Sequence, residues 1–236
     1  MKYGGTSVES IQKIDTIAKH IKQVKETEDN IVLVVSAMGK STDELIALAK
    51  ELTDELPRRE IDTLLSTGEQ KTIALFAIAL KKHGIDAISL TGFQAGFVTT
   101  SSHTKGIIKD VDITRVHKHI NEGKVVVVAG FQGMSSNGDI TTLGRGGSDT
   151  SAVALAVKLG YACEIYTDVD GIYTVDPRIH INAKKLDSIS FEEMMEMASL
   201  GTGVIEARSV ELAKKYDVDL YVARSLSAKG SGTKIM

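Results

Sequence analysis

Hydrophobic residues gather in short runs along the chain. Ile31–Ser36 and Val125–Ala129 are nearly continuous β-branched runs, and shorter runs occur at Ala87–Leu90, Glu164–Thr167 and Val218–Val222. These runs lack the regular polar alternation of a strand with one face in solvent. They therefore predict strands that are buried on both faces of a parallel sheet.

Between these runs, apolar residues recur at helical spacing. The apolar positions of Ile11–Val24 mark one face of a predicted helix. Capping-box patterns at Ser41–Glu44 and Ser190–Glu193 predict two more helices, one running through Leu52 and the other over Phe191–Leu200. Because strands and helices alternate, we predict an α/β fold with a mainly parallel sheet in a single domain.

One segment departs from this alternation. Ser135–Thr142 contains Asn137 and Gly138, a dipeptide typical of a two-residue hairpin turn. The sequence therefore also predicts two short antiparallel strands here.

The composition excludes several classes of protein. The net charge of −3 over 236 residues gives no basic footprint for nucleic acid. The longest apolar runs are too short to span a bilayer, and the first residues do not form a secretory signal. The single cysteine, Cys163, cannot form an internal disulfide, and its apolar neighbours predict a buried strand thiol. We therefore expect a cytoplasmic globular protein with no nucleic-acid or membrane partner.

The first candidate site is the segment Lys2–Ser7, ahead of the first predicted helix. Gly4 and Gly5 allow the backbone to approach a ligand closely. The following helix offers free N–H groups to a phosphate, and Lys2 adds a positive charge. The alternative is an ordinary turn followed by a helix cap, and glycines alone do not decide between the two.

The second candidate site is the segment Thr141–Asp149, which has three glycines around Arg145. The guanidinium group of arginine can hold a carboxylate or phosphate through two parallel hydrogen bonds. Ser148 or Asp149 could instead be the N-cap of the helix predicted over Thr150–Leu159. Since a cap does not explain an arginine within a glycine run, we favour a binding site.

Three acidic residues lie near the ends of predicted elements. Asp168 and Asp170 follow the strand Glu164–Thr167, where the loops of an open parallel sheet line its ligand crevice, but acids at this spacing are also common in turns. Glu69 precedes the apolar helical segment Ile73–Leu80. It could interact with the helix dipole or hold a substrate ammonium group, and these alternatives stay open.

Other common sites are excluded by spacing. Gly39–Thr42 resembles the end of a P-loop, but the glycine that a P-loop needs five residues earlier is replaced by Val34. No G-x-G-x-x-G follows a predicted strand. His117 and His119 are two residues apart and do not share a helix face, so no zinc-ligand pattern is present and we expect no protein metal site.

Six segments in order resemble the catalytic domain of the aspartate kinases, within the amino acid kinase family: KYGGTS, VVSAMGKSTDEL, LLSTGEQ, GFQGM, ITTLGRGGSDTSAVALA and YTDVDGIYTVDPR. The resemblance implies a three-layer α/β/α sandwich around a mainly parallel central sheet. It also implies that ATP and L-aspartate react, with Mg²⁺, to ADP and 4-phospho-L-aspartate, the first step toward lysine, threonine and methionine. A homo-oligomer is expected.

The same resemblance implies roles for individual residues. The amino-terminal part binds aspartate, and the part from about residue 140 binds ATP. The implied catalytic residues are Lys2 and Asp149. The implied substrate-binding residues are Ser36, Thr42, Glu69, Phe131, Arg145, Gly146, Gly147 and Ser148. The implied nucleotide-binding residues are Lys2, Gly4, Gly5, Thr6, Ser7, Thr167, Asp168, Tyr173 and Arg178.

The chain departs from the family pattern at three places. Only Met1 precedes Lys2, which leads us to expect a clipped first strand or an upstream start. Within Gly201–Arg208, Gly203 stands where relatives have a lysine, and Glu206 stands where they have a histidine. The chain stops where relatives continue into regulatory ACT domains, so we expect these domains to be absent.

Two other functions compete with aspartate phosphorylation. The departures are compatible with a non-catalytic binding or assembly module. A related kinase could act on glutamate, carbamate or a nucleoside monophosphate. Arg145 and Glu69 together provide one group for each end of an α-amino acid, which argues against carbamate and nucleotides.

Overall fold

The structure, a computed structural model, describes residues 1–201, 203–227 and 230–236. Its helices are α1 (Ile11–Val24), α2 (Ser41–Lys50), α3 (Arg58–Lys82), α4 (Thr114–Asn121), α5 (Gly147–Leu159), α6 (Phe191–Ser199) and α7 (Ala207–Tyr216). Its strands are β1 (Lys2–Tyr3), β2 (Val32–Val35), β3 (Ala87–Leu90), β4 (Phe97–Thr99), β5 (Ile108–Val111), β6 (Val125–Ala129), β7 (Gln132–Ser135), β8 (Ile140–Thr142), β9 (Cys163–Thr167), β10 (Ser188–Ile189), β11 (Leu220–Arg224) and β12 (Thr233–Ile235).

The main sheet has eight strands in the order β10, β12, β11, β9, β1, β2, β6 and β3. Neighbouring strands are parallel throughout, except that β11 and β12 are antiparallel. The five strands expected from the apolar runs are β2, β3, β6, β9 and β11, and all five lie in this sheet. The expected α/β class with a mainly parallel sheet is confirmed.

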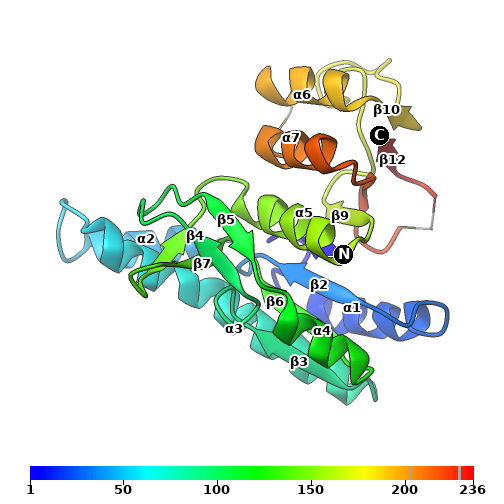
Figure 1. The fold of residues 1–236 in the computed structure, drawn as a ribbon. Helices are drawn as coiled ribbons and strands as arrows, with labels where there is room; N and C mark the ends of the chain where they lie inside the picture. Colours follow the sequence, from blue (N-terminus) through cyan, green and yellow to red (C-terminus); the bar gives the residue numbers. More distant parts are fainter. Residues whose placement is uncertain (202, 228–229) are drawn as a thin grey trace.

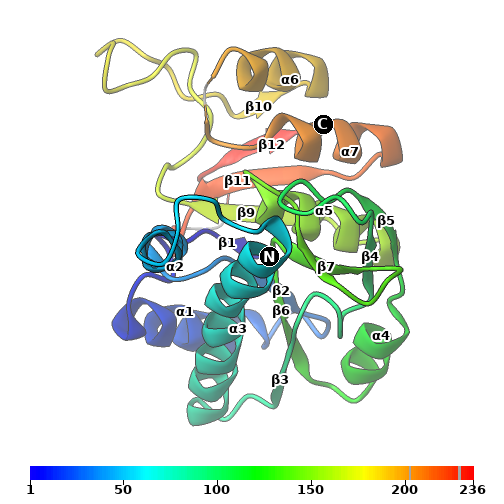
Figure 2. The same ribbon diagram turned by 90° about the vertical axis from the view of Figure 1, so that its left-hand side faces the viewer.

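Helices cover both faces of the main sheet (Figures 1 and 2). Along β6, Val126 and Val128 belong to the apolar core shared with α4, α5, α6 and α7. Val125 and Val127 point the other way, into the core shared with α1 and α3. The uninterrupted valine run is therefore explained by a strand with apolar layers on both sides, and the expected three-layer sandwich is confirmed.

A second sheet of four strands, in the order β5, β4, β7 and β8, lies beside the amino-terminal half of α3 (Figure 2). The hairpin expected at Ser135–Thr142 is confirmed, because β7 and β8 are antiparallel and the turn between them contains Gly138 at φ +82°. The sequence patterns did not predict β4 and β5. This sheet positions the carboxyl end of β8, from which the second glycine-rich segment continues.

The two expected capping boxes have different outcomes. At the start of α6, the Ser190 hydroxyl accepts a hydrogen bond from the Glu193 N–H, and the Glu193 carboxylate accepts one from the Ser190 N–H, as expected. At α2 the prediction was wrong, because Lys40 is the N-cap and Ser41 is already helical. The turn before α2 pairs the Ser41 N–H with the Met38 carbonyl, so no side-chain cap forms there.

Helix α3 begins much earlier than the apolar pattern suggested. It starts at Arg58, so the interpretation of Glu69 as an acid at a helix start was wrong. The first turns of α3 carry charged residues that conceal the helical period. Gly68 lies inside the helix, where a β-carbon would come within 2.9 Å of the Ala37 side chain. This close approach brings the middle of α3 against the carboxyl end of β2.

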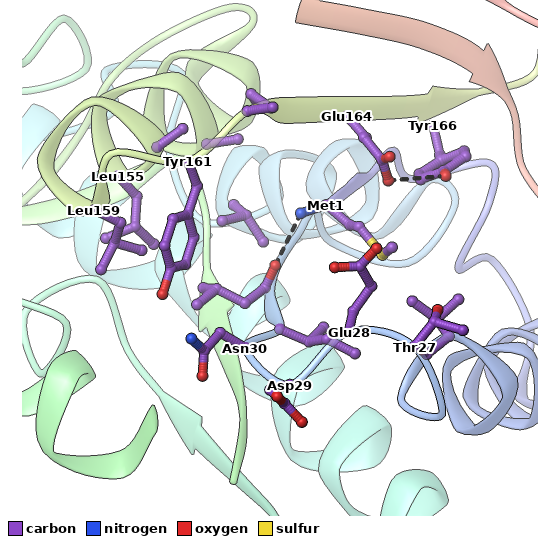
Figure 3. A pocket seen from close by; sticks show the side chains of 18 of the residues that line it. Met1, Thr27, Glu28, Asp29, Asn30, Leu155, Leu159, Tyr161, Glu164 and Tyr166 are labelled. Atoms are coloured by element: carbon purple, nitrogen blue, oxygen red, sulfur yellow. Dashed lines mark hydrogen bonds between the residues drawn. The ribbon is translucent and has the colours of Figure 1, made fainter. Parts of the chain in front are cut away.

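A cavity of about 550 Å³ lies at the amino ends of the central strands, between β2 and β9 beyond the start of β1 (Figure 3). Met1, Leu155, Leu159 and Tyr161 line it, as does Cys163. Burial raises the pKa of the Cys163 thiol to about 11, in agreement with the expected buried strand thiol. No described helix is long and apolar enough to cross a membrane.

Candidate active site

The carboxyl ends of β1, β2, β6 and β9 meet at one edge of the main sheet, because these strands are parallel neighbours or near neighbours. Loops at this edge line the ligand crevice of open parallel sheets. Most of the residues expected in the site follow these strands or lie on α3 and α5, which pack beside them. The cavity of Figure 3 lies at the opposite edge and is not part of this site.

Lys2 and Asp149 form a buried ion pair at the centre of this edge. Lys2 Nζ lies 2.6 Å from Asp149 Oδ1, and each residue is 8% exposed. Asp149 comes from the first turn of α5, whose N-cap is Gly146 in the left-handed conformation with no side-chain cap. The alternative reading of Ser148 or Asp149 as the N-cap is therefore wrong, and the Asp149 carboxylate is directed to Lys2.

The segment Gly4–Ser7 forms a tight turn rather than a helix start. The Ser7 N–H donates to the Gly4 carbonyl at 2.9 Å, and α1 begins only at Ile11, with Ser10 as its own cap. The expectation that this segment lies directly ahead of the helix was wrong. A β-carbon on Gly5 would lie 2.9 Å from the Ala37 carbonyl oxygen, so close backbone packing requires a glycine there.

Glu69 is a buried acid with one unused oxygen. Its Oε1 accepts a hydrogen bond from the Ala37 N–H at 3.1 Å, while Oε2 is buried without a hydrogen-bond partner among the described residues. Burial is the main cause that raises the Glu69 pKa to about 8. A perturbed acid with an open oxygen in the middle of a helix fits a cationic ligand rather than the helix dipole.

The loop that carries Arg145 is fixed by its backbone. Gly144 and Gly146 have φ values of +76° and +66°. Arg208 Nη2 donates to the carbonyl oxygens of Leu143, at 3.1 Å, and Arg145, at 2.8 Å. The Arg145 side chain is exposed. The glycine run therefore presents an arginine from a fixed backbone.

Phe131 and Ser148 lie beside this loop. Phe131 has a φ of +69°, and its N–H donates to the Ser151 hydroxyl at 3.0 Å. A β-carbon on Gly147 would lie 2.9 Å from the Phe131 ring, and one on Gly130 would lie 2.9 Å from the Ser148 β-carbon. The end of β6 and the start of α5 thus approach as closely as their backbones allow.

Ser36 and Thr42 lie near Glu69 in the chain's path. The Ser36 N–H donates to the Tyr3 carbonyl at 3.2 Å, which fixes the end of β2 beside β1. The next residue, Ala37, is the one whose N–H reaches Glu69. Thr42 is half-buried in the first turn of α2.

The residues expected to bind the nucleotide separate into two groups. The Thr167 carbonyl accepts a hydrogen bond from the Ser225 N–H at 3.1 Å, and the Ser225 hydroxyl donates to the Ser7 hydroxyl at 2.6 Å, which joins the ends of β9 and β11 to the first glycine-rich segment. Ser225 was not singled out in the sequence. The Thr167 hydroxyl also donates to Asp168 at 3.1 Å, and Asp168 is exposed.

Tyr173 and Arg178 belong to the second group, in the loop after β9. The Tyr173 hydroxyl donates to the Asp170 carboxylate at 3.1 Å. Arg178 pairs with Asp176 at 2.8 Å, and its side chain is 88% exposed. Each of these expected residues is paired within its own loop.

The departure at Glu206 lies against the Arg145 loop. Glu206 is the N-cap of α7, and its β-carbon is 2.4 Å from the position that a β-carbon on Gly146 would take. An acid therefore stands beside the expected substrate site. Gly203 has a φ of +63°, and Thr202 of the same segment lies outside the described residues.

A sequence profile of the amino acid kinase family matches residues 1–224. An aspartate kinase of Pseudomonas putida is 53% identical over 99% of this chain, and aspartokinase 2 of Bacillus subtilis is 52% identical over the same share. The chain spans 57% of the length of each of these relatives.

Solved structures give the same relationship. The aspartate kinase of Synechocystis is 47% identical, with a TM-score of 0.88, and the match covers all of this chain and 39% of that one. Aspartokinase III of Escherichia coli, solved in complex with aspartate and ADP, is 26% identical with a TM-score of 0.87 over 99% of this chain and 63% of that one. A uridylate kinase of Archaeoglobus fulgidus, 21% identical with a TM-score of 0.72, shares the fold.

Proposed function

The chain belongs to the amino acid kinase family, and on that premise we propose that it transfers the γ-phosphoryl group of ATP to the side-chain carboxylate of L-aspartate. The products are ADP and 4-phospho-L-aspartate. The observation that carries the proposal is the unpaired buried oxygen of Glu69 at the same sheet edge as the Lys2–Asp149 ion pair. Relatives that are about half identical over almost the whole chain are aspartate kinases.

Glu69 and Arg145 suit the two ends of the amino acid. The buried Glu69 oxygen has no partner among the described residues, and an α-ammonium group would supply both a donor and a countercharge. The exposed guanidinium group of Arg145 would grip the α-carboxylate. Ser36, Thr42 and Phe131 would close the pocket around the substrate, together with Gly146, Gly147 and Ser148.

Lys2 suits the phosphoryl group in transfer. The side-chain carboxylate of aspartate, with an ordinary pKa of about 3.9, is already a nucleophile at neutral pH, so no general base is required. The main difficulty is to bring one anion to another, which calls for positioning and neutralisation of charge. Asp149 would hold Lys2 in place, and the loop Gly4–Ser7 with Thr167 and Asp168 would contact the nucleotide.

Mg²⁺ would enter as the MgATP complex. No three His, Cys, Asp or Glu side chains of the described residues are grouped to hold a metal ion. Mg²⁺ in kinases is commonly held by substrate phosphates and one or two carboxylates, and this site offers Asp149 and Asp168 as acids. The bound ion would neutralise phosphate charge, while Lys2 supplies the positive charge that comes from the protein.

We assign the amino-terminal part to aspartate and the part from about residue 140 to ATP, with Arg145–Ser148 reaching back to the amino acid. Tyr173 and Arg178 would reach the nucleotide from their loop. We also propose that the protein works in the cytoplasm as a homo-oligomer.

Trapping with hydroxylamine tests the function directly. Purified protein with MgATP and L-aspartate should yield aspartyl hydroxamate, and omission of either substrate should abolish it. Arg145→Ala should raise the aspartate KM at least about tenfold, the loss expected for a charge-assisted hydrogen bond, and leave the ATP KM nearly unchanged. Folded protein that binds ATP in a calorimeter without turnover would instead support a non-catalytic module.

A further inference from the structure

Asp62, on α3, is a fully buried carboxylate outside the set of residues discussed above. Its side chain has no exposed surface. The Thr104 N–H donates to both of its oxygens, at 2.9 and 3.1 Å, and His103 Nδ1 lies 2.9 Å from Oδ2. The Thr142 hydroxyl donates to Oδ1. A buried carboxylate is stable only when donors surround it, and this one has donors from two separate segments.

Both of these segments lead to the Arg145 loop. Thr142 is the last residue of β8, three positions before Arg145. Thr104 has a φ of +66°, and its carbonyl oxygen is 3.2 Å from the position that a β-carbon on Gly144 would take. The Gly106 N–H donates to the Thr142 carbonyl at 2.8 Å, which joins the two segments to each other.

The other end of the connection is Glu69. Asp62 and Glu69 are seven residues apart on α3, which is about two turns, so both lie on the same buried face. One helix therefore carries the acid expected to hold the substrate ammonium and the acid that anchors the strand leading to Arg145. The separation between Glu69 and Arg145 depends on this anchor.

We propose that Asp62 is a positioning residue that sets the spacing between Glu69 and Arg145, and thereby the fit of the site to aspartate. This inference rests on the proposed function. The ammonium and the α-carboxylate of an amino acid sit on one carbon, so a shift of Arg145 relative to Glu69 misplaces the side-chain carboxylate with respect to Lys2. The donors to Asp62 come from His103, Thr104 and Thr142, and none of these belongs to the segments assigned to the nucleotide.

Two sets of variants test the proposal. Asp62→Asn replaces an acceptor oxygen with a donor group and should raise the aspartate KM about tenfold or more, with the ATP KM within about twofold of the wild type. Thr142→Val removes one donor and should act in the same direction to a smaller extent. Thr142→Ser keeps the hydroxyl and should behave like the wild type. The Thr142 pair also decides the question if Asp62→Asn does not fold.

Hydrogen exchange gives a readout that does not need activity. Amides of residues 142–147 should exchange faster in Asp62→Asn than in the wild type, with little change in α1. An unchanged aspartate KM in folded Asp62→Asn, an equal rise in both KM values, or a Thr142→Ser variant as impaired as Thr142→Val would overturn the proposal. If the wild type does not phosphorylate aspartate, unchanged exchange over residues 142–147 would overturn it independently.

Discussion

Lys2 Nζ lies 2.6 Å from the carboxylate of Asp149, and both side chains are almost completely shielded from solvent. The pair joins the first strand to the first turn of α5, two elements far apart in the sequence. Asp149 compensates the lysine charge while no phosphate is present. The structure therefore holds a preformed positive group at the strand edge where phosphoryl transfer is proposed, which avoids reorganisation during the reaction.

The first prediction concerns this pair. Lys2→Met and Asp149→Asn should each lower kcat by about 10²–10³, because each removes a preorganised electrostatic contact. The aspartate KM should change much less. The double variant should be little slower than either single variant, since residues that act as one unit are not additive. Multiplying losses in the double variant would contradict the assigned partnership.

A second prediction follows from the raised pKa of Glu69, about 8. At pH 6–7 the free protein holds this carboxyl mainly as the neutral acid, and an ammonium ligand favours the ionised form. Aspartate binding should therefore release a proton, and affinity should increase with pH up to about 8 and then level off. Calorimetry in two buffers of different ionisation enthalpy measures this release. Glu69→Gln should bind more weakly without this pH dependence, and a wild type that releases no proton at pH 7 would contradict the assignment.

The same residue predicts an effect on stability. The folded pKa is raised, so between about pH 4.5 and 8 the unfolded chain loses the Glu69 proton while the folded chain keeps it, and the folded state is progressively destabilised. Glu69→Gln removes this effect and can retain the acceptor for Ala37. Its free energy of unfolding, from urea titrations, should exceed that of the wild type by a few kcal/mol at pH 8, on the order of one to two pKa units of linkage, and by little at pH 4. An equal difference at both pH values would indicate a cause other than ionisation.

The sequence predicted the central sheet well because its strands are buried on both faces. A strand such as β6 has no polar position, so its limits could be read directly from the valine run. Strands β4 and β5 escaped prediction, because Ile108–Val111 includes two charged residues in a four-residue strand. The start of α3 escaped because its charged first turns do not show the apolar period.

The candidate site was predicted unevenly for a related reason. Arg145 within a glycine run is a local signal, and the ordered motifs gave Lys2 and Glu69. Asp62 and Arg208 have no local signal, because their roles depend on contacts with Thr142 and Leu143, some 80 and 65 positions away. Only the three-dimensional structure brings these partners together.

The last prediction uses the two glycines at the ends of α5. Gly146 has a φ of +66° and Gly160 a φ of +68°, so alanine at either position meets similar backbone strain, on the order of 1 kcal/mol. Their surroundings differ, since a β-carbon at Gly146 would lie 2.4 Å from the Glu206 β-carbon, whereas none of the surrounding atoms lies within 4 Å at Gly160.

Gly146→Ala should therefore displace the Arg145 loop and raise the aspartate KM at least about tenfold, whereas Gly160→Ala should lose a similar amount of stability and keep the wild-type KM. Glu206→Gly combined with Gly146→Ala should recover part of the lost affinity, because it removes the β-carbon and the carboxylate that collide with the new methyl group. Steady-state kinetics at matched protein stability measure all three. Equal KM values for Gly146→Ala and Gly160→Ala would show that the clash is absorbed without moving Arg145. Failure of the double variant to recover affinity would show that backbone strain at Gly146, rather than contact with Glu206, is the cause.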